Sequence, residues 1–194
     1  MSIARAQATQ DAPPRPLSSA ASSQAAFDAG LPADDFKAFF RHHPGGVSLI
    51  TAVGDAGPVA LTATSLASIS AEPPLVVFSV SDLSSSAPVL READTVVVHL
   101  LGSEDLELAK LGATSGIDRF ADTSIWAPLE TGEPTFHGTR WLRCRVVNRF
   151  PTGTSTLIVG QALESSDAAD TDRQGLVYVD RTWHRLGEHS RAHA

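Results

Sequence analysis

Short apolar runs that end in turn residues are the feature that most limits how this chain can fold. Residues 46–53, 59–64 and 75–80 are rich in β-branched and aliphatic side chains, which is typical of β-strands. The first run stops at residues 54–58, a cluster of glycine, aspartate and proline that signals a turn. Because few long helical segments separate these runs, the pattern argues against a parallel, doubly wound sheet.

More strand signals follow toward the C-terminus. Residues 95–101, like the run at 75–80, are apolar without alternation, so we expect both strands to be covered on two faces. Residues 140–150 alternate arginines with apolar side chains, which predicts one strand with two different faces. The whole pattern predicts a mainly β protein, an antiparallel barrel with a few short peripheral helices. Three further strands are expected at 156–162, 176–180 and 182–186, and the last of these is expected to close the sheet.

Three short helices are expected beside the strands. The first, at 32–42, places three phenylalanines on one face. The second is expected to begin near Ser85 and to end near Ala93, because serines followed by a proline commonly open a helix. The third has Ser103 as its N-cap and Gly112 as its C-terminal stop. The three phenylalanines of the first helix are Phe36, Phe39 and Phe40.

Composition and charge exclude several classes of function. The formal net charge of −7 argues against non-specific nucleic-acid binding, because no basic stripe is available for phosphate backbones. No apolar run is long enough for a membrane span, and no signal peptide is recognisable. The single cysteine, Cys144, excludes an intramolecular disulfide and a cysteine-rich zinc site. We therefore expect a soluble, cytoplasmic protein without a nucleic-acid or membrane partner.

The ends of the chain differ in composition from its middle. Residues 1–30 are rich in alanine, serine, glutamine and proline, and they hold almost no bulky apolar side chains. Such a segment buries too little apolar surface to offset its ordering entropy, so a disordered tail is predicted. Residues 31–188 are expected to form one folded domain, and the polar residues 189–194 are expected to fray.

Serine and threonine hydroxyls are concentrated in residues 57–90, on both sides of the apolar run 75–78, and this stretch has no lysine. Its second polar part leads into the helix expected near Ser85. The unpaired N–H groups and the dipole of a helix start suit a phosphate. A serine-rich hairpin with an ordinary helix cap fits the same pattern, so the residues alone leave both interpretations open.

Several short motifs follow one another in a recognisable order. They are His43-Pro44-Gly45-Gly46-Val47, Leu61-Thr62-Ala63-Thr64-Ser65, Ser68 to Pro74, Arg119-Phe120, Gly132-Glu133-Pro134, Leu142-Arg143-Cys144-Arg145, and Leu176-Val177-Tyr178 with Trp183. In this order they resemble the flavin reductase-like family, from about Phe36 to Leu186. The resemblance implies an FMN-binding split β-barrel of Greek-key type over residues 31–188, a homodimer, and FMN as cofactor with FAD as an alternative.

The resemblance also implies which residues contact the flavin. The first polar segment would follow the flavin ring and ribityl chain, where fixed donors stabilise the reduced ring. The second would hold the phosphate. Many relatives have a cation in that loop where this chain has Asp82. The phosphate charge would then be met by serine hydroxyls, by the helix end, or by an arginine from elsewhere, for which Arg91 and Arg119 are the candidates. The candidate flavin-binding residues are Thr62, Ala63, Thr64, Ser65, Ser79, Ser81, Ser84, Ser85, Ser86 and Arg119.

The chain departs from the family pattern after the strand that holds Cys144. Family members that oxidise a nicotinamide cofactor often carry Gly-Asp-His, and this chain has Gly153-Thr154-Ser155 instead. Hydride transfer requires two rings at close range and no acid or base from the protein, so no side chain is assigned a catalytic role. The resemblance predicts a flavin reductase that uses NADH or NADPH, as the reductase component of a flavin-dependent monooxygenase system. A non-catalytic flavin carrier, or an oxidoreductase with another electron donor such as a deazaflavin, are the alternatives.

Three other residues have two interpretations each. His99 lies in an apolar strand, as a satisfied buried histidine or as a residue behind the flavin. Cys144 alternates with arginines and is interpreted as a core residue rather than a nucleophile. Trp183 is either a packing residue or a cover for the flavin.

Overall fold

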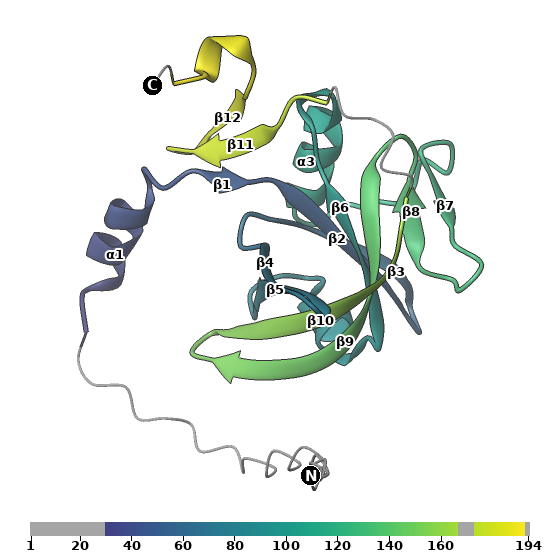
Figure 1. Cartoon of the computed structure of the whole chain (residues 1–194). Coiled ribbons are helices and arrows are strands. Elements are labelled where there is room, and N and C mark those ends of the chain that lie inside the picture. The colour runs from purple at the N-terminus through teal and green to yellow at the C-terminus, as the bar shows by residue number, and fades with distance from the viewer. Residues whose placement is uncertain (1–29, 167–172, 193–194) are drawn as a thin grey trace, which may run out of the picture.

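Seven antiparallel strands form the main sheet in the computed structural model, which describes residues 30–166 and 173–192 (Figure 1). The predicted tail at 1–30 lies outside the described residues except for Gly30. Across the sheet the strand order is β3-β2-β6-β9-β10-β5-β4. The strands are β2 (Ser48–Gly54), β3 (Gly57–Ala63), β4 (Ala67–Ala71), β5 (Pro74–Ser81), β6 (Thr95–Leu100), β9 (Arg140–Thr152) and β10 (Ser155–Ser165).

The two edge strands of this sheet, β3 and β4, are consecutive in the chain and are joined only by residues 64–66. The sheet therefore curls until its edges approach each other and form a barrel with an open seam. Ser65 ties the linker to β5, because its hydroxyl accepts a hydrogen bond from the Ser79 N–H at 3.0 Å. The antiparallel split barrel predicted from the sequence is confirmed. Strand β4 was not predicted, because its sequence is short and polar.

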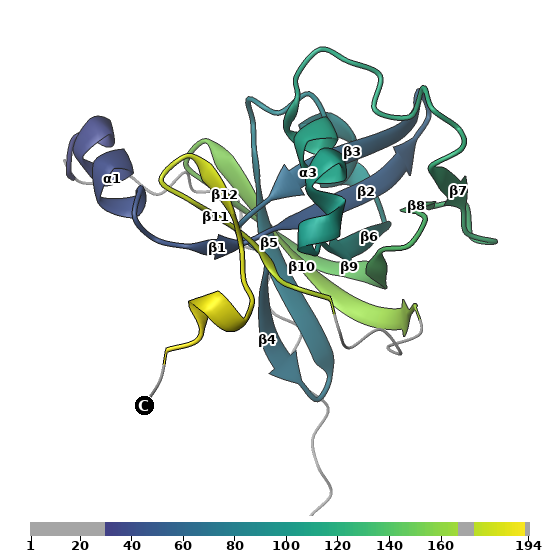
Figure 2. The same cartoon turned by 90° about the horizontal axis from the view of Figure 1, so that it is seen from above.

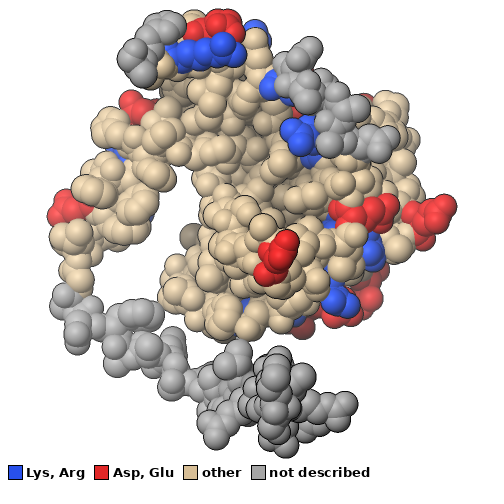
Figure 3. Space-filling model, in the orientation of Figure 1, with Lys and Arg blue, Asp and Glu red and all other residues tan. Residues whose placement is uncertain are grey.

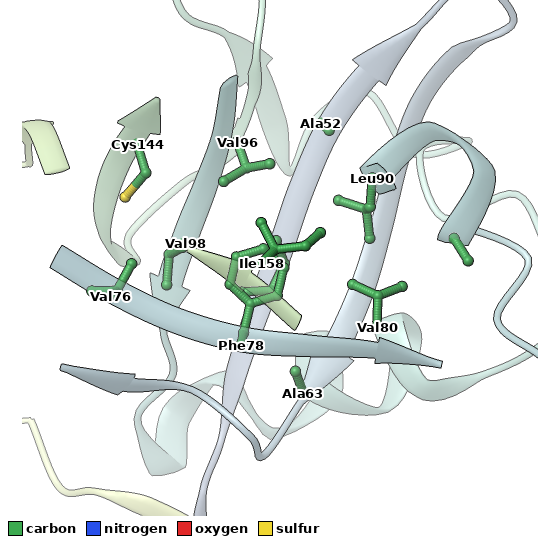
Figure 4. Packing of buried hydrophobic residues seen from close by; sticks show 12 residues of the cluster. Ala52, Ala63, Val76, Phe78, Val80, Leu90, Val96, Val98, Cys144 and Ile158 are labelled. Carbon is green, nitrogen blue, oxygen red and sulfur yellow. The ribbon is translucent and has the colours of Figure 1, made fainter. Parts of the chain in front are cut away.

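The barrel interior is filled by one face of each main strand (Figure 4). Phe78 of β5 and Ile158 of β10 point toward Val96 and Val98 of β6, and all four are fully buried. Leu90 of α2 (Ala87–Glu92) closes one end. Each such side chain contributes about 1.5–3 kcal/mol of transfer free energy on burial. This core fixes the barrel on which the site is built.

A second core lies on the outer face of β2, where α3 (Leu106–Ala113) covers the sheet (Figure 2). The two-stranded sheet of β7 (Trp126–Pro128) and β8 (Pro134–Phe136) completes this layer. Strand β6 is consequently buried on both faces, as predicted. The same prediction for residues 75–80 is wrong. Strand β5 alternates buried and half-buried positions, because no second layer covers its outer face.

A separate three-stranded sheet contains β1 (Gly45–Gly46), β11 (Leu176–Val179) and β12 (Thr182–Arg185), in the order β1-β11-β12. The prediction that residues 182–186 close the main sheet is therefore wrong, since β12 pairs only with β11. The two-residue turn between them holds Asp180 and Arg181 at positive φ, 48° and 59°.

The three predicted helices exist, but both predicted ends of the third are wrong: Asp105, not Ser103, is the N-cap of α3, and Gly112 lies inside the helix. Helix α2 follows Ser86 as its N-cap and has a proline in its first turn, as expected. A 3₁₀ turn at Ser103–Asp105 precedes α3, and the helix continues through Gly112 to Ala113, so Gly112 is not its stop. This glycine serves close packing instead, because a Cβ there would collide with Leu49 and Thr62.

Helix α1 (Ala33–Phe40) stands away from the barrel and has no buried residue. Its phenylalanines pack against one another, with the Phe36 and Phe40 ring centroids 4.8 Å apart. Phe39 nevertheless remains 79% exposed. No helix among residues 30–166 and 173–192 is long and apolar enough to cross a membrane.

Candidate functional site

The segment Thr62–Ser65 lies at the end of β3, on the seam of the barrel. Thr62 donates its hydroxyl to the Ala109 carbonyl at 2.8 Å and so fixes α3 on the sheet. Ala63 is buried in the core. Thr64 and Ser65 are exposed, and Ser65 is held against Ser79. Because β3 is an edge strand, its outer backbone groups have no neighbouring strand, and those not engaged by side chains, as the Ala60 carbonyl is by Ser86, are available to a ligand.

In the serine-rich loop before α2, some hydroxyls form hydrogen bonds within the protein and one does not. Ser81 and Ser84 accept hydrogen bonds from nearby backbone N–H groups, those of Leu83 and Ser86, both at 3.3 Å. Ser86 is buried and donates its hydroxyl to the Ala60 carbonyl of β3 at 2.8 Å. Within the described residues, the Ser85 hydroxyl makes no hydrogen bond and is exposed.

Ser85 and Ser86 face Arg119 across a cleft of about 120 Å³ that also contacts residues 58–60 of β3. One Arg119 nitrogen, Nη2, donates to the Thr114 carbonyl at 2.6 Å. Its Nε is buried and has no hydrogen-bond partner among the described residues. An unpaired buried donor costs roughly 1–3 kcal/mol, which an anion in the cleft would remove. Asp118 also lines the cleft, and one of its oxygens accepts the Phe120 N–H at 2.9 Å.

The structure distinguishes between Arg91 and Arg119, the two arginines that the sequence offered as partners for the phosphate. Arg91 forms an ion pair with Asp82, with 2.8 Å between Nη1 and Oδ1, so the acidic residue of the loop takes up that charge. Both side chains are more than one-third exposed, so this pair contributes little to stability. Arg119 lines the same cleft as Ser85 and forms no ion pair within the described residues, so it is the arginine placed to meet a phosphate.

The segment that replaces Gly-Asp-His forms the β9–β10 turn. Gly153 has a φ of 59°, a conformation that favours glycine. The Thr154 carbonyl accepts the Asp82 N–H at 3.0 Å, and Ser155 lies opposite Ser81 in the strand register. The hydroxyl-rich turn therefore packs beside the serine loop.

His99 is a buried structural histidine. Its Nδ1 lies 2.8 Å from the Thr139 hydroxyl and its Nε2 lies 3.4 Å from the Thr51 hydroxyl. Burial lowers the pKa of His99 to about 3, so the ring is neutral at physiological pH. It lines neither of the two clefts described here.

The other two residues with open interpretations differ in burial: Cys144 is buried and Trp183 is half-buried. Cys144 is fully buried, and burial raises the pKa of its thiol to about 11, which fits a core residue. Trp183 packs on Tyr178, with ring centroids 4.7 Å apart, in the sheet of β11 and β12.

Sequence reasoning missed a larger cleft of about 380 Å³. Phe36 and Arg41 from the α1 region line it together with Tyr178 and Arg181 of the β11–β12 hairpin, and Thr64 lies at its side. Its parts are far apart in the sequence, and no local pattern marks them as one site. The only hint in the sequence was the group of three phenylalanines predicted on one face of the first helix, and the structure leaves all three exposed.

Comparison with known proteins agrees with this geometry. The family model described as "Flavin reductase like domain" matches residues 40–187, and the chain belongs to this family. An NADH:FMN oxidoreductase of Rhodococcus qingshengii is 47% identical over 132 residues, which cover 68% of this chain and 69% of that protein. The reductase component of a 4-nitrophenol 4-monooxygenase/4-nitrocatechol 2-monooxygenase of Rhodococcus opacus is 28% identical over 68% of this chain and 70% of its own. The crystal structure of a flavin reductase domain protein from Arthrobacter sp. FB24 superposes with a TM-score of 0.74 at 29% identity, covering 79% of this chain and 95% of that one.

Proposed function

We propose that this chain is an FMN reductase that uses NADH. The observation that carries the proposal is the edge of β3, which joins two features suited to one flavin. At one end Ser85 and Arg119 line a cleft together with Ala60, and at the other end Thr64 and Ser65 lie at the seam. Thr64, just past the end of β3, lies four residue steps from Ala60, a span of about 13 Å along an extended chain. The relative named NADH:FMN oxidoreductase, at 47% identity, supports both the cofactor and the donor.

Each group in the site has a simple task. Arg119 and Ser85 would bind the phosphate, and the free backbone edge of β3 would hold the polar edge of the ring. Ser79, Ser81, Ser84 and Ser86 shape the loop through their own hydrogen bonds. When bound, FMN supplies the acceptor for the hydride of NADH. The protein's contribution is to position two rings and to keep water away from them.

NADH oxidation by the purified chain, with and without added FMN, tests the proposal. We expect turnover that depends on FMN, and we expect bound flavin to bleach when NADH is added without oxygen. NADPH in the same assay measures the preference between the two donors. Tight FMN binding without bleaching by either donor would reject the reductase and favour a flavin carrier or another electron donor.

We also propose that the reduced flavin serves a monooxygenase. The support is the relative from Rhodococcus opacus, which is named as the reductase component of such a system. The folded domain is proposed to span residues 31–188, with a cytoplasmic location. Product formation by a flavin-dependent monooxygenase that receives only FMN, NADH and this chain would support the assignment. A requirement for a different reductase under the same conditions would contradict it.

A homodimer is proposed from the exposed apolar surface. Helix α1 has eight residues, too few to be stable alone, and it buries none of them in its own chain. Figure 3 shows α1 standing off from the barrel, with few charged side chains on the surface that faces it. A second copy of the chain would cover Phe39, which is 79% exposed and does not line the larger cleft. Light scattering after size-exclusion chromatography should give a dimer, and Phe39→Glu should shift it toward the monomer. A monomeric wild type at micromolar concentration would contradict the proposal.

A further inference from the structure

The larger cleft combines aromatic rings with positive charge. Phe36 and Phe40 of α1 and Tyr178 of β11 provide the rings. Lys37, Arg41 and Arg181 also line the cleft and provide three cations. Among the described residues, Asp180 is the one carboxylate that lines it. Planar aromatic side chains beside guanidinium groups suit a ligand that joins a flat ring to phosphates.

Two of these cations have no acidic partner. The Lys37 ammonium lies 3.2 Å from the Asp34 carboxylate on the same helix. In contrast, neither Arg41 nor Arg181 forms an ion pair within the described residues. Both guanidinium groups can therefore bind an anion without first breaking a salt bridge.

The turn that carries Arg181 is held in an unusual conformation. Both central residues of this turn have positive φ, which usually selects Asn-Gly or Gly-Gly, yet here they are Asp180 and Arg181. The Asp180 N–H donates to the Arg41 carbonyl at 2.8 Å, so the turn is fastened to the end of α1. Strained turns of this kind are kept where the surrounding structure and the function require them. The result is that Arg181 and Arg41 lie on one cleft.

We propose that this cleft binds the adenosine phosphate half of a dinucleotide. The inference rests on the proposed function, because Thr64 lies both beside the cleft and at the ring end of the flavin site. The FMN phosphate is already assigned to Arg119, at the other end of β3, so the cations of the larger cleft serve a different phosphate. Two dinucleotides carry this group in the proposed reaction, NADH as donor and FAD as an alternative flavin.

Calorimetric titration of the whole chain, free of flavin, with ADP-ribose tests the inference directly. Arg181→Gly removes the guanidinium, and glycine accepts the positive φ, so the variant should fold with an unchanged or higher Tm. We expect it to bind ADP-ribose about five- to tenfold more weakly, and Arg41→Gln should act in the same direction. Asp180→Asn tolerates the turn and removes the lining carboxylate, so binding should tighten by about twofold.

A matched control comes from the same hairpin. Arg185 of β12 is exposed and does not line the cleft, and Arg185→Gln removes one positive charge. ADP-ribose affinity should be unchanged in this variant. Equal losses in Arg181→Gly and Arg185→Gln would overturn the inference, because they would reflect net charge alone. So would ADP-ribose binding that is absent in the wild type or insensitive to Arg181 and Arg41.

Steady-state kinetics and flavin titration separate the two sources. A raised KM for NADH in Arg181→Gly with unchanged FAD affinity assigns the cleft to the donor. Weaker FAD binding with unchanged FMN affinity and unchanged KM assigns it to the flavin, and either result supports the inference. Failure of the proposed function is distinguishable, because it would remove NADH oxidation while leaving the Arg181-dependent binding of ADP-ribose in place.

Discussion

Two arginines lie in different surroundings on two sides of the barrel. The side where Arg143 meets Glu133 is the closed side, and the side with the cleft beside β3, which Arg119 lines, is the open side. On the closed side Arg143 donates from Nε to the Glu133 carboxylate at 2.8 Å, and this acid is 1% exposed. At the cleft beside β3, Arg119 also has a buried Nε, but no acceptor meets it within the described residues. The difference teaches that charge satisfied inside the fold stabilises the barrel, whereas charge left open is available to a ligand.

Removing Glu133 should lower the free energy of unfolding, because the Arg143 guanidinium on the closed side loses its partner. Although burial opposes ionisation, hydrogen bonds from Thr131 and Thr95 and the nearby Arg143 lower the pKa of Glu133. Glu133→Ala strands the guanidinium, and we expect a loss of about 3–5 kcal/mol in unfolding free energy. Urea unfolding measures it. The comparison fails if the variant loses less than about 1 kcal/mol, the range of an exposed pair.

Removing Arg119 should weaken the binding of flavin and change the free energy of unfolding little. In Arg119→Gln the ligand loses a charge-assisted hydrogen bond, so we expect FMN affinity to fall by a factor of about 10–100. Fluorescence quenching of FMN gives the affinity. Urea unfolding without flavin should differ from the wild type by less than about 1 kcal/mol, because losing the Thr114 hydrogen bond is offset by removing the unpaired Nε. Arg119→Lys, which keeps the charge but not the fork, should fall between the two. Unchanged FMN affinity in Arg119→Gln would show that the open donor has another use.

Acid should lower the free energy of unfolding through His99, which is buried between Thr51 and Thr139. Its pKa is about 3 in the folded state against 6.5 in the unfolded chain, so below pH 6.5 the unfolded state binds the extra proton. The stabilisation is therefore complete above pH 6.5 and is lost as the pH falls, by about 1.4 kcal/mol per unit between pH 6 and 4. Urea unfolding at several pH values should show this slope. The same slope in His99→Gln would assign the loss to other groups.

How much was predictable from the sequence depends on how local the signal is. The strand at 140–152 was visible because alternation along one strand records its two faces. The serine loop before α2 was visible because the helix start follows from Ser86 and Pro88. The pairing of Arg91 with Asp82 and the free Nε of Arg119 were not predictable, because each depends on side chains brought together from separate segments.

The sequence by itself determined the class of fold and the family, because turn residues, strand periodicity and the order of motifs are properties of the linear chain. It also located the stretch that becomes the seam. Only the tertiary structure decided which hydroxyls are free and which arginine faces the serines, and it alone placed α1 beside the β11–β12 hairpin. Those outcomes depend on how the sheet curls and which side chains it buries, and the free energy of such contacts is set by neighbours that the linear order does not record.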